Sequence, residues 1–274
     1  MRAVLLTFLL AAPLAAQHGQ LYTGPPTTME TLRVHWAREA DFDGSILFCR
    51  GFYNLNRLED NGVGWWTDYP GADQNFLVRL ADLTVIRVRF DQDGRIPFYR
   101  VVSLDDPLLF KCPVVFMSDV GVIALTKPEI AGLASYLAHG GFVWVDDFWG
   151  PEAWHQWETE LRQALPSAQY PMIDIPESHP INRMMYNIWP IQQQPNIGLW
   201  TSTKETSERG VLSEDVHFQG VTDTHGRLIV VMTHNTDIAD GWEEEKPENQ
   251  AYIREFSARS YAIGVNIFLY ALTH

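Results

Sequence analysis

Residues 114–150 read VVFMSDVGVIALTKPEIAGLASYLAHGGFVWVDDFWG, and this stretch decides the fold. Its apolar segments at residues 114–117 and 142–145 each have the length of a buried strand. A helical pattern lies between them. A helix that connects two strands is typical of a crossover between parallel strands, so the stretch predicts a βαβ unit.

The helix of this unit has signals at both ends. Thr126 and Glu129 are spaced as a capping box, in which the threonine hydroxyl accepts from the third helical N–H and the glutamate reaches back to the cap. Gly140 and Gly141 end the helix, because glycine tolerates the left-handed conformation of a C-terminal cap. The apolar positions that follow a 3.6-residue spacing are Ile130, Leu133, Ala134 and Leu137. The sequence therefore predicts where this helix begins, where it ends and which face it buries.

Further strands and helices alternate on both sides of the unit. The other predicted strands are residues 45–53, 85–90, 95–101, 172–175 and 228–232. The other predicted helices are residues 75–83, a helix beginning at Pro151, and residues 261–272. Residues 91–94 resemble the opening of a calcium loop, but a hairpin turn is favoured because the downstream ligand spacing is missing. The alternation predicts an α/β three-layer sandwich with a mostly parallel sheet covered on both faces.

The first sixteen residues have the pattern of a secretory signal peptide. Arg2 precedes an apolar run at residues 3–14, which is followed by Ala15 and Ala16. The run is shorter than the roughly 20 apolar residues that a membrane span needs. We therefore expect three parts: a signal peptide at residues 1–16, a lead segment at 17–44 and a single α/β domain at 45–274. The mature protein is expected to be exported, periplasmic or extracellular, and not membrane-spanning.

Charge and cysteine content limit the possible partners. The formal net charge is −14 at pH 7 and the basic residues are scattered, so nucleic acid is excluded as an expected partner. Cationic ligands, metal ions and neutral glycans stay open. Cys49 and Cys112 either form a disulfide, as export would allow, or remain two buried thiols. Their spacing does not suggest a zinc site.

Two acidic groups follow predicted strands. The chain has no GxSxG, HExxH, P-loop or GxGxxG motif. Instead, Asp146-Asp147 ends one strand, and residues 234–242, HNTDIADGW, follow another. Ligands of open parallel sheets bind beyond the carboxyl ends of the strands, so both groups are expected around one cleft. Carboxylates that lie close together raise one another's pKa, which suits proton transfer, and with imidazole they suit a divalent metal.

The candidate residues follow from this expectation. The catalytic candidates are Asp146, Asp147 and His234, and the ligand-binding candidates are Trp149, Asp237, Asp240, Trp242, Trp66 and Asp68. No cofactor is identified, and a divalent metal would have Asp147, His234 and Asp237 as candidate ligands. Alternative interpretations stay open: the carboxylates also serve to cap a helix or brace a turn, and the tryptophans also serve to pack the core.

The quoted stretch resembles the class I glutamine amidotransferase-like superfamily, especially its trehalose-utilisation-protein-like branch. There a helix ending in paired glycines leads to the strand before the nucleophile elbow, and residues 179–181, HPI, resemble a motif of that branch. The chain is more similar still to an uncharacterised bacterial family of domains of unknown function. The segments that carry this resemblance are 65–77, WWTDYPGADQNFL, 145–150, VDDFWG, and 234–242. The resemblance implies a flavodoxin-like amidotransferase fold, no established activity, and genes near MoxR-type ATPases and von Willebrand-type domain proteins.

The chain departs from the amidotransferase pattern at the elbow, which reads Asp146-Asp147-Phe148. Amidotransferases need a thiolate there, and neither cysteine is near, so glutaminase activity is predicted to be absent. We expect an exported ligand-binding or interaction module for an envelope glycan or partner protein. The alternative is a carboxylate- or metal-dependent hydrolase, in which His234 and Asp237 assist Asp147.

Overall fold

The structure is a computed structural model that describes residues 19–24, 27–58 and 62–274. The predicted signal peptide at residues 1–16 lies outside the described residues. Within the described residues, seven strands form the main sheet in the order β3-β1-β4-β6-β9-β8-β7. The strands are β1 (Phe48–Phe52), β3 (Tyr99–Ser103), β4 (Val115–Ser118), β6 (Val143–Phe148), β7 (Met172–Asp174), β8 (His217–Thr222) and β9 (Leu228–His234).

The sheet is mostly parallel, as the alternation of strands and helices predicts. β3, β1, β4, β6 and β9 run parallel, and β8 and β7 continue the sheet as antiparallel strands. The sequence did not reveal β8. Its run HFQGVT contains Gly220, where a Cβ would lie only 2.9 Å from the carbonyl oxygen of Val230 on β9. A glycine interrupts the apolar pattern of a strand, and here it permits the close approach of β9.

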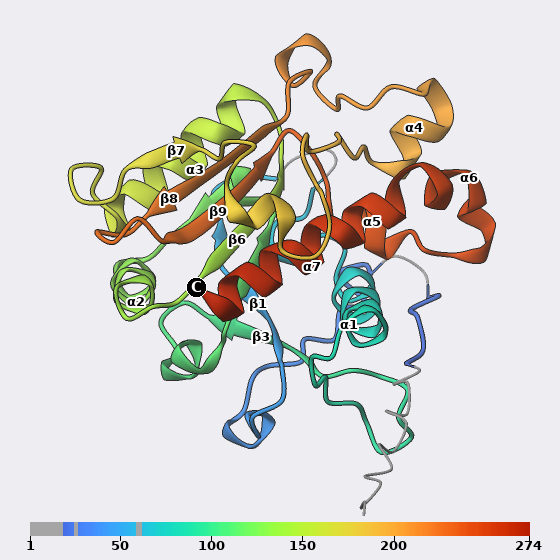
Figure 1. Ribbon diagram of the computed structural model, residues 1–274, viewed down its shortest axis with the longest axis horizontal. Coiled ribbons are helices and arrows are strands. Elements are labelled where there is room, and N and C mark those ends of the chain that lie inside the picture. The colour runs from blue at the N-terminus through green and yellow to red at the C-terminus, as the bar shows by residue number, and fades with distance from the viewer. Residues whose placement is uncertain (1–18, 25–26, 59–61) are drawn as a thin grey trace, which may run out of the picture.

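Helices cover both faces of the sheet (Figure 1). The helices are α1 (Gly71–Leu83), α2 (Lys127–Ala138), α3 (Gly150–Ala164), α4 (Ile197–Thr203), α5 (Asp240–Glu243), α6 (Gln250–Tyr252) and α7 (Ala258–Thr273). α7 crosses in front of the strands in Figure 1 with α1 beside it, and α1, α5 and α7 contact one another. α2 and α3 contact each other on the other face. The α/β sandwich with a mostly parallel sheet is therefore confirmed.

Each helical layer packs on the sheet through large side chains. Phe268 of α7 stacks on Phe48 of β1 with ring centroids 5.7 Å apart. On the other face, the Trp157 indole of α3 donates to the Met232 sulfur of β9 at 3.3 Å. Both aromatic side chains are completely buried, so each contributes about 1.5–3 kcal/mol or more of hydrophobic stabilisation.

The capping box is present as the sequence predicts. The Glu129 carboxylate accepts from the Thr126 backbone N–H at 2.7 Å, and the Thr126 hydroxyl accepts from the Glu129 N–H at 3.4 Å. This reciprocal pairing satisfies two of the free N–H groups at the start of α2.

The predicted hairpin at residues 85–101 is only partly present. Its turn forms, because the Asp91 carboxylate accepts from the backbone N–H groups of Arg95 and Ile96. In place of two paired strands, Phe90 and Pro97 form an isolated antiparallel bridge, and Val88 forms an isolated parallel bridge with Ile46. β3, which includes the last three residues of the predicted strand 95–101, pairs in parallel with β1 and forms the edge of the main sheet.

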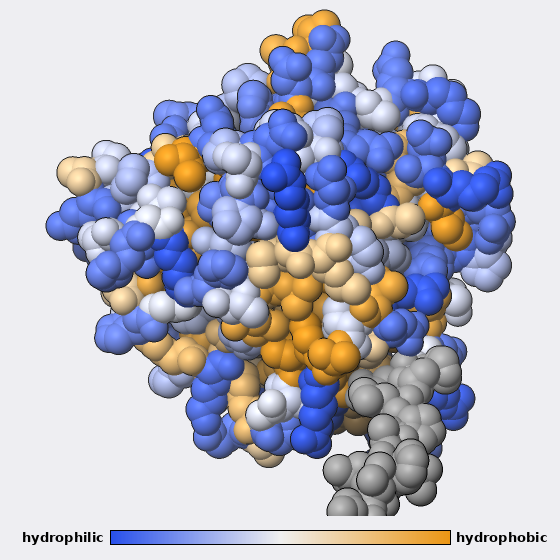
Figure 2. Space-filling view, viewed as in Figure 1, coloured by the Kyte–Doolittle hydropathy of each residue, from blue (hydrophilic) through white to orange (hydrophobic). Residues whose placement is uncertain are grey.

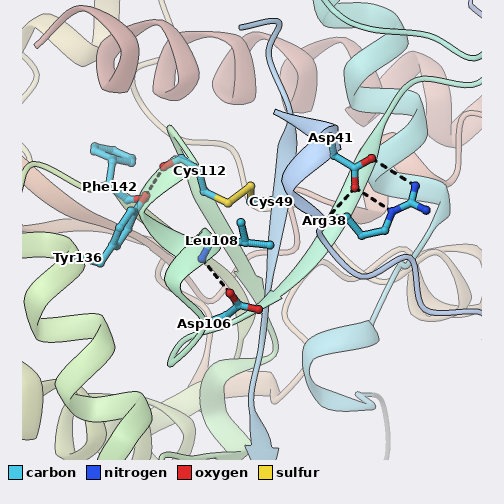
Figure 3. Close-up of a disulfide and its surroundings, with 8 residues drawn as sticks. All are labelled: Arg38, Asp41, Cys49, Asp106, Leu108, Cys112, Tyr136 and Phe142. Carbon is cyan, nitrogen blue, oxygen red and sulfur yellow. Dashed lines mark hydrogen bonds and ion pairs between the residues drawn. A yellow bond between two sulfur atoms is a disulfide. The ribbon is translucent and has the colours of Figure 1, made fainter. Parts of the chain in front are cut away.

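Cys49 and Cys112 form a disulfide, which decides between the two alternatives that the sequence left open (Figure 3). Cys49 lies on β1, and Cys112 follows a short 3-10 helix at Pro107–Lys111. The Tyr136 hydroxyl of α2 donates to the Cys112 carbonyl at 2.9 Å. The disulfide thus closes a loop that contains α1 and β3.

The outer surface carries apolar as well as polar areas. Figure 2 shows apolar side chains gathered on the face where α1 and α7 lie, with polar side chains around them. A cavity of about 430 Å³ on this face is lined in part by Leu83, Tyr186 and Ala262. Among the described residues, none of the helices combines the length and the apolar run that a bilayer crossing requires.

Candidate functional site

Acidic side chains converge at the carboxyl ends of β6 and β9. The charges of Asp147, Asp68, Asp240 and Asp146 help to raise the pKa of Asp237. The segments 146–150 and 234–242 therefore lie close together, as the sequence predicts. We call this group the acidic cluster; its members are Asp68, Asp146, Asp147, Asp237 and Asp240. The last four are almost completely buried, and Asp68 is half-buried.

Backbone pairing holds the two acidic segments together. The Asp147 N–H donates to the Thr236 carbonyl at 3.2 Å, and the Asn235 N–H donates to the Phe148 carbonyl at 3.0 Å. The Asp146 carboxylate accepts from the Thr233 hydroxyl at 2.5 Å and from the Ala239 N–H at 3.0 Å. Asp146 therefore fixes the loop that carries Asp237 and Asp240.

The backbone is left-handed at several residues around the cluster. Asp68, Asp119, Asp147 and Asn235 have φ values of 62°, 52°, 55° and 61°. Asp119 and Asn235 immediately follow strands of the parallel sheet, and Asp147 is the last residue but one of β6. Residues other than glycine rarely adopt this conformation. Such outliers cost free energy and collect at functional sites, where the surrounding structure enforces them.

Three carboxylates of the cluster could hold a metal ion. Ligand atoms of Asp68, Asp237 and Asp240 lie within 4.8 Å of one another. The Oδ2 atom of Asp68 is buried and has no hydrogen-bond partner. A buried carboxylate oxygen without a donor is costly, and a hard cation with oxygen ligands would satisfy it. We call these three residues the aspartate triad.

The triad is built by hydrogen bonds from several elements. The Asp237 carboxylate accepts from the Asp240 N–H at 2.8 Å. The Asp240 carboxylate accepts from the Ile197 N–H at 2.8 Å and from the Tyr252 hydroxyl at 3.3 Å. Asp240, Glu243 and Glu244 form a second group that could hold a metal ion, and Lys246 pairs with Glu244 at 3.0 Å.

A buried arginine supports the loop that carries Asp68. Arg50 of β1 donates to both carboxylate oxygens of Asp73 and to the carbonyls of Trp65 and Thr67 at 3.1 and 2.9 Å. Sequence reasoning missed this residue. The available signal was a lone arginine inside the apolar run SILFCRGFY at residues 45–53. A charge in a buried strand requires a partner, so its presence indicates a second, buried acidic residue.

Burial and mutual repulsion raise the pKa values of the cluster. Burial is the main cause for Asp68, Asp147, Asp237 and Asp240, whose pKa values are all raised well above the usual range. Neighbouring carboxylates add to the effect in each case. Burial also raises the pKa of Asp146 to about 7. The cluster can therefore hold protons at neutral pH, or exchange them for a cation.

The raised pKa of Asp146 predicts a pH-dependent stability. The folded state binds the proton more tightly than the unfolded state, so this stabilisation is complete below about pH 4 and is lost as the pH rises to about 7. Asparagine keeps an acceptor and cannot ionise. Between pH 5 and pH 8, wild type should lose the stabilisation that the protonated Asp146 provides, whereas Asp146→Asn should not. We therefore expect the free energy of unfolding of Asp146→Asn minus that of wild type to increase by about 2–3 kcal/mol over this range. Urea unfolding at both pH values measures it.

Asp93→Asn, in an exposed turn, is the matched control and should follow the wild type at both pH values. A difference between Asp146→Asn and wild type that is the same at pH 5 and pH 8 would contradict the raised pKa.

His234 lies on a different face from the acidic cluster. Successive residues of a strand point to opposite faces, so His234 shares the α3 face with Met232, while Thr233 faces Asp146. Its ring packs on Phe148 and Trp154 with centroids 4.7 and 5.2 Å apart. In the part of the chain that the structure describes, neither possible metal group includes His234 or Asp147. The geometry thus favours the aspartate triad over the set Asp147, His234 and Asp237.

The candidate tryptophans have different surroundings. The Trp149 indole donates to the Asp147 carboxylate at 2.9 Å. Trp242 is completely buried among Phe76, Phe116 and Trp144, so it serves the core and is not accessible to a ligand. Trp66 is half-buried and packs against the core.

Sequence reasoning also missed Glu208, which belongs to the hydroxyl-rich segment 201–209. It accepts from the Asn196 N–H at 2.8 Å, and its charge helps to raise the pKa of Asp147. No local pattern in the sequence indicates that this segment lies near Asp147 of β6.

Comparison with protein families matches residues 54–272 to the family described as "Domain of unknown function (DUF4159)". Comparison with curated proteins finds no match.

Proposed function

The chain belongs to the DUF4159 family, whose function is unknown, so we propose a function from the site itself. We propose that the protein is an exported module that binds its ligand with the help of a divalent cation. The observation that carries this proposal is the aspartate triad with the unpartnered Oδ2 atom of Asp68. Carboxylate oxygens are the ligands that Mg²⁺, Ca²⁺ and Mn²⁺ prefer.

Export is part of the same proposal. The pattern of residues 1–16 supports it. The disulfide between Cys49 and Cys112 supports it independently, because disulfides persist in oxidising compartments such as the periplasm. An envelope glycan or protein remains the proposed partner.

The cation is tested by titrating EDTA-treated protein with Ca²⁺, Mg²⁺ and Mn²⁺ in a calorimeter. We expect one cation to bind per chain, and Asp237→Asn to weaken its binding about 100-fold, equivalent to about 2.7 kcal/mol. Asp237 belongs to the aspartate triad and not to the second acidic group, so this variant assigns the cation to the triad. Asparagine preserves the shape of the side chain but removes the charge. Asp93→Asn, which removes the same charge at an exposed turn outside the triad, should leave the affinity unchanged.

Absence of stoichiometric binding by every cation at millimolar concentration would refute the cation-dependent module. Equal loss of affinity in Asp237→Asn and Asp93→Asn would mean that binding depends on overall charge and not on the triad.

A second candidate function is a cation-dependent hydrolase, and Asp147 is the observation that favours it. The charge of the Asp147 carboxylate helps to raise the pKa of Asp237, and this carboxylate accepts a hydrogen bond from the Trp149 indole. The backbone of Asp147 is left-handed. A carboxyl group with a raised pKa beside a cation can donate or accept a proton during hydrolysis. Asp147→Asn would then abolish turnover while cation binding persists, whereas a pure binding module would show no turnover in either protein.

We further propose that the domain is a divergent form of the class I glutamine amidotransferase-like fold. The left-handed Asp147, near the end of β6 and three residues before the start of α3, supports this, because it resembles a nucleophile elbow. Both cysteines form the disulfide, so neither offers a thiolate, and glutaminase activity remains predicted to be absent.

A further inference from the structure

Lys246 is the one buried lysine in the part of the chain that the structure describes. Its side chain is 8% exposed, whereas Lys111, Lys127 and Lys204 are exposed residues. A lysine is almost never buried unless its charge has a partner, because removing an ammonium group from water costs free energy. The surroundings of Lys246 must therefore supply negative charge.

The second acidic group, which consists of Asp240, Glu243 and Glu244, supplies this charge. The Lys246 ammonium donates to the Glu244 carboxylate at 3.0 Å, and the Glu244 side chain is also only 8% exposed. Burial tends to lower the pKa of Lys246, but the charges of the three carboxylates outweigh this effect and raise it. Lys246 is therefore a charged ammonium that interacts with every member of the group.

The turn after α5 fixes Lys246 in this position. The Lys246 N–H donates to the Glu244 carbonyl at 2.7 Å, and the Asn249 N–H donates to the Lys246 carbonyl at 2.9 Å. The Asn249 side-chain amide also donates to the Glu244 carboxylate, at the oxygen that Lys246 does not contact. Both carboxylate oxygens of Glu244 therefore have donors from the protein itself.

The aspartate triad differs in this respect. Arg50, whose charge acts on Asp68, is bonded to Asp73 and to two backbone carbonyls. The Asp68 Oδ2 atom is buried and has no hydrogen-bond partner. Of the two acidic groups, the triad is thus the one that still needs a positive charge.

We propose that Lys246 serves as the internal cation of the second acidic group and thereby limits the whole cluster to one divalent cation, which the aspartate triad holds. Asp240 belongs to both groups. A divalent cation in the second group would displace the ammonium from Glu244 and would repel a cation in the triad across their shared ligand. The inference rests on the proposed function, because it explains how many cations the same site takes up.

Calcium binding to Lys246→Met tests the proposal, by calorimetry and equilibrium dialysis after EDTA treatment. Methionine is unbranched like lysine but carries no charge. We expect wild type to bind one Ca²⁺ per chain and Lys246→Met to bind two, because the carboxylates of the second group are then free for a cation that prefers oxygen ligands. Lys246→Arg keeps the charge and should bind one. Lys127→Met, at an exposed lysine of α2, is the matched control and should also bind one.

Two double variants locate the second cation. Lys246→Met/Glu244→Gln removes one carboxylate of the second group, so it should return to one Ca²⁺ per chain. Lys246→Met/Asp237→Asn changes only the triad, so it should weaken the cation there about 100-fold and leave the second cation bound. Near-UV circular dichroism checks that each variant is folded. Lys246→Gln keeps a donor for Glu244 and removes only the charge, so it repeats the test if methionine unfolds the protein.

The outcomes separate this inference from the proposed function. One Ca²⁺ bound by both wild type and folded Lys246→Met would refute the role of Lys246 alone. Two Ca²⁺ bound by wild type would also overturn it, because the lysine would then not limit the number of cations. Wild type that binds no Ca²⁺ while Lys246→Met binds one would refute the triad as a cation site and would support the role of Lys246.

Discussion

Replacing Arg50 with methionine is expected to lower the free energy of unfolding by about 3–5 kcal/mol. Arg50 and Asp73 are both completely buried, and their closest contact is 2.7 Å. Methionine would leave the Asp73 charge and the carbonyls of Trp65 and Thr67 without donors. A buried charge without a partner is among the most destabilising changes that a single substitution can make. Urea unfolding followed by circular dichroism measures the loss.

An exposed arginine offers a matched control. Arg38 pairs with Asp41 at 3.4 Å, and 73% of its side chain is exposed. Arg38→Met should change stability by less than about 1 kcal/mol, because water surrounds the Arg38 side chain and the buried Asp41 keeps its contact with Arg100 at 2.8 Å. The double variant Arg50→Met/Asp73→Leu should be more stable than Arg50→Met, since it removes the unpaired charge. If Arg50→Met and Arg38→Met cost the same, the buried pair does not have the role that we assign to it.

Removing the disulfide is expected to lower the free energy of unfolding by about 4 kcal/mol. Cys49 and Cys112 are separated by 63 residues, and closing a loop of this length restricts the unfolded chain by about that amount. The double variant Cys49→Ala/Cys112→Ala tests this in urea. Reduced wild-type protein is the control, because it loses the cross-link and keeps both sulfur atoms.

Reduced wild type and the double variant should have similar stabilities, both well below the oxidised protein. Oxidised and reduced wild type that unfold at the same urea concentration would show that the cross-link does not limit the unfolded chain.

These experiments test residues that stabilise the structure around the aspartate triad and do not bind the cation. Arg50 supports the loop that carries Asp68, and the disulfide ties β1 to the segment before β4. Neither contributes a ligand atom to the aspartate triad. Variants of Arg50 should therefore alter cation binding only through stability or the position of Asp68.

The sequence by itself determined the elements whose signals are local. The capping box at Thr126 and the glycines at residues 140–141 act within one helix, and hydrophobic periodicity predicted β4, β6, β9 and α7. It also predicted that the segments 146–150 and 234–242 would meet, because parallel strands end at the same edge of a sheet.

Only the tertiary structure decided which side chains share the site. His234 and Thr233 are adjacent in sequence but face opposite sides of β9, and the two-residue period of a strand separates them. Asp68 joins Asp237 because Arg50 and Asp73 fix the loop between β1 and α1. These contacts span many residues, and their free energy comes from burial and charge pairing that no local pattern in the sequence encodes.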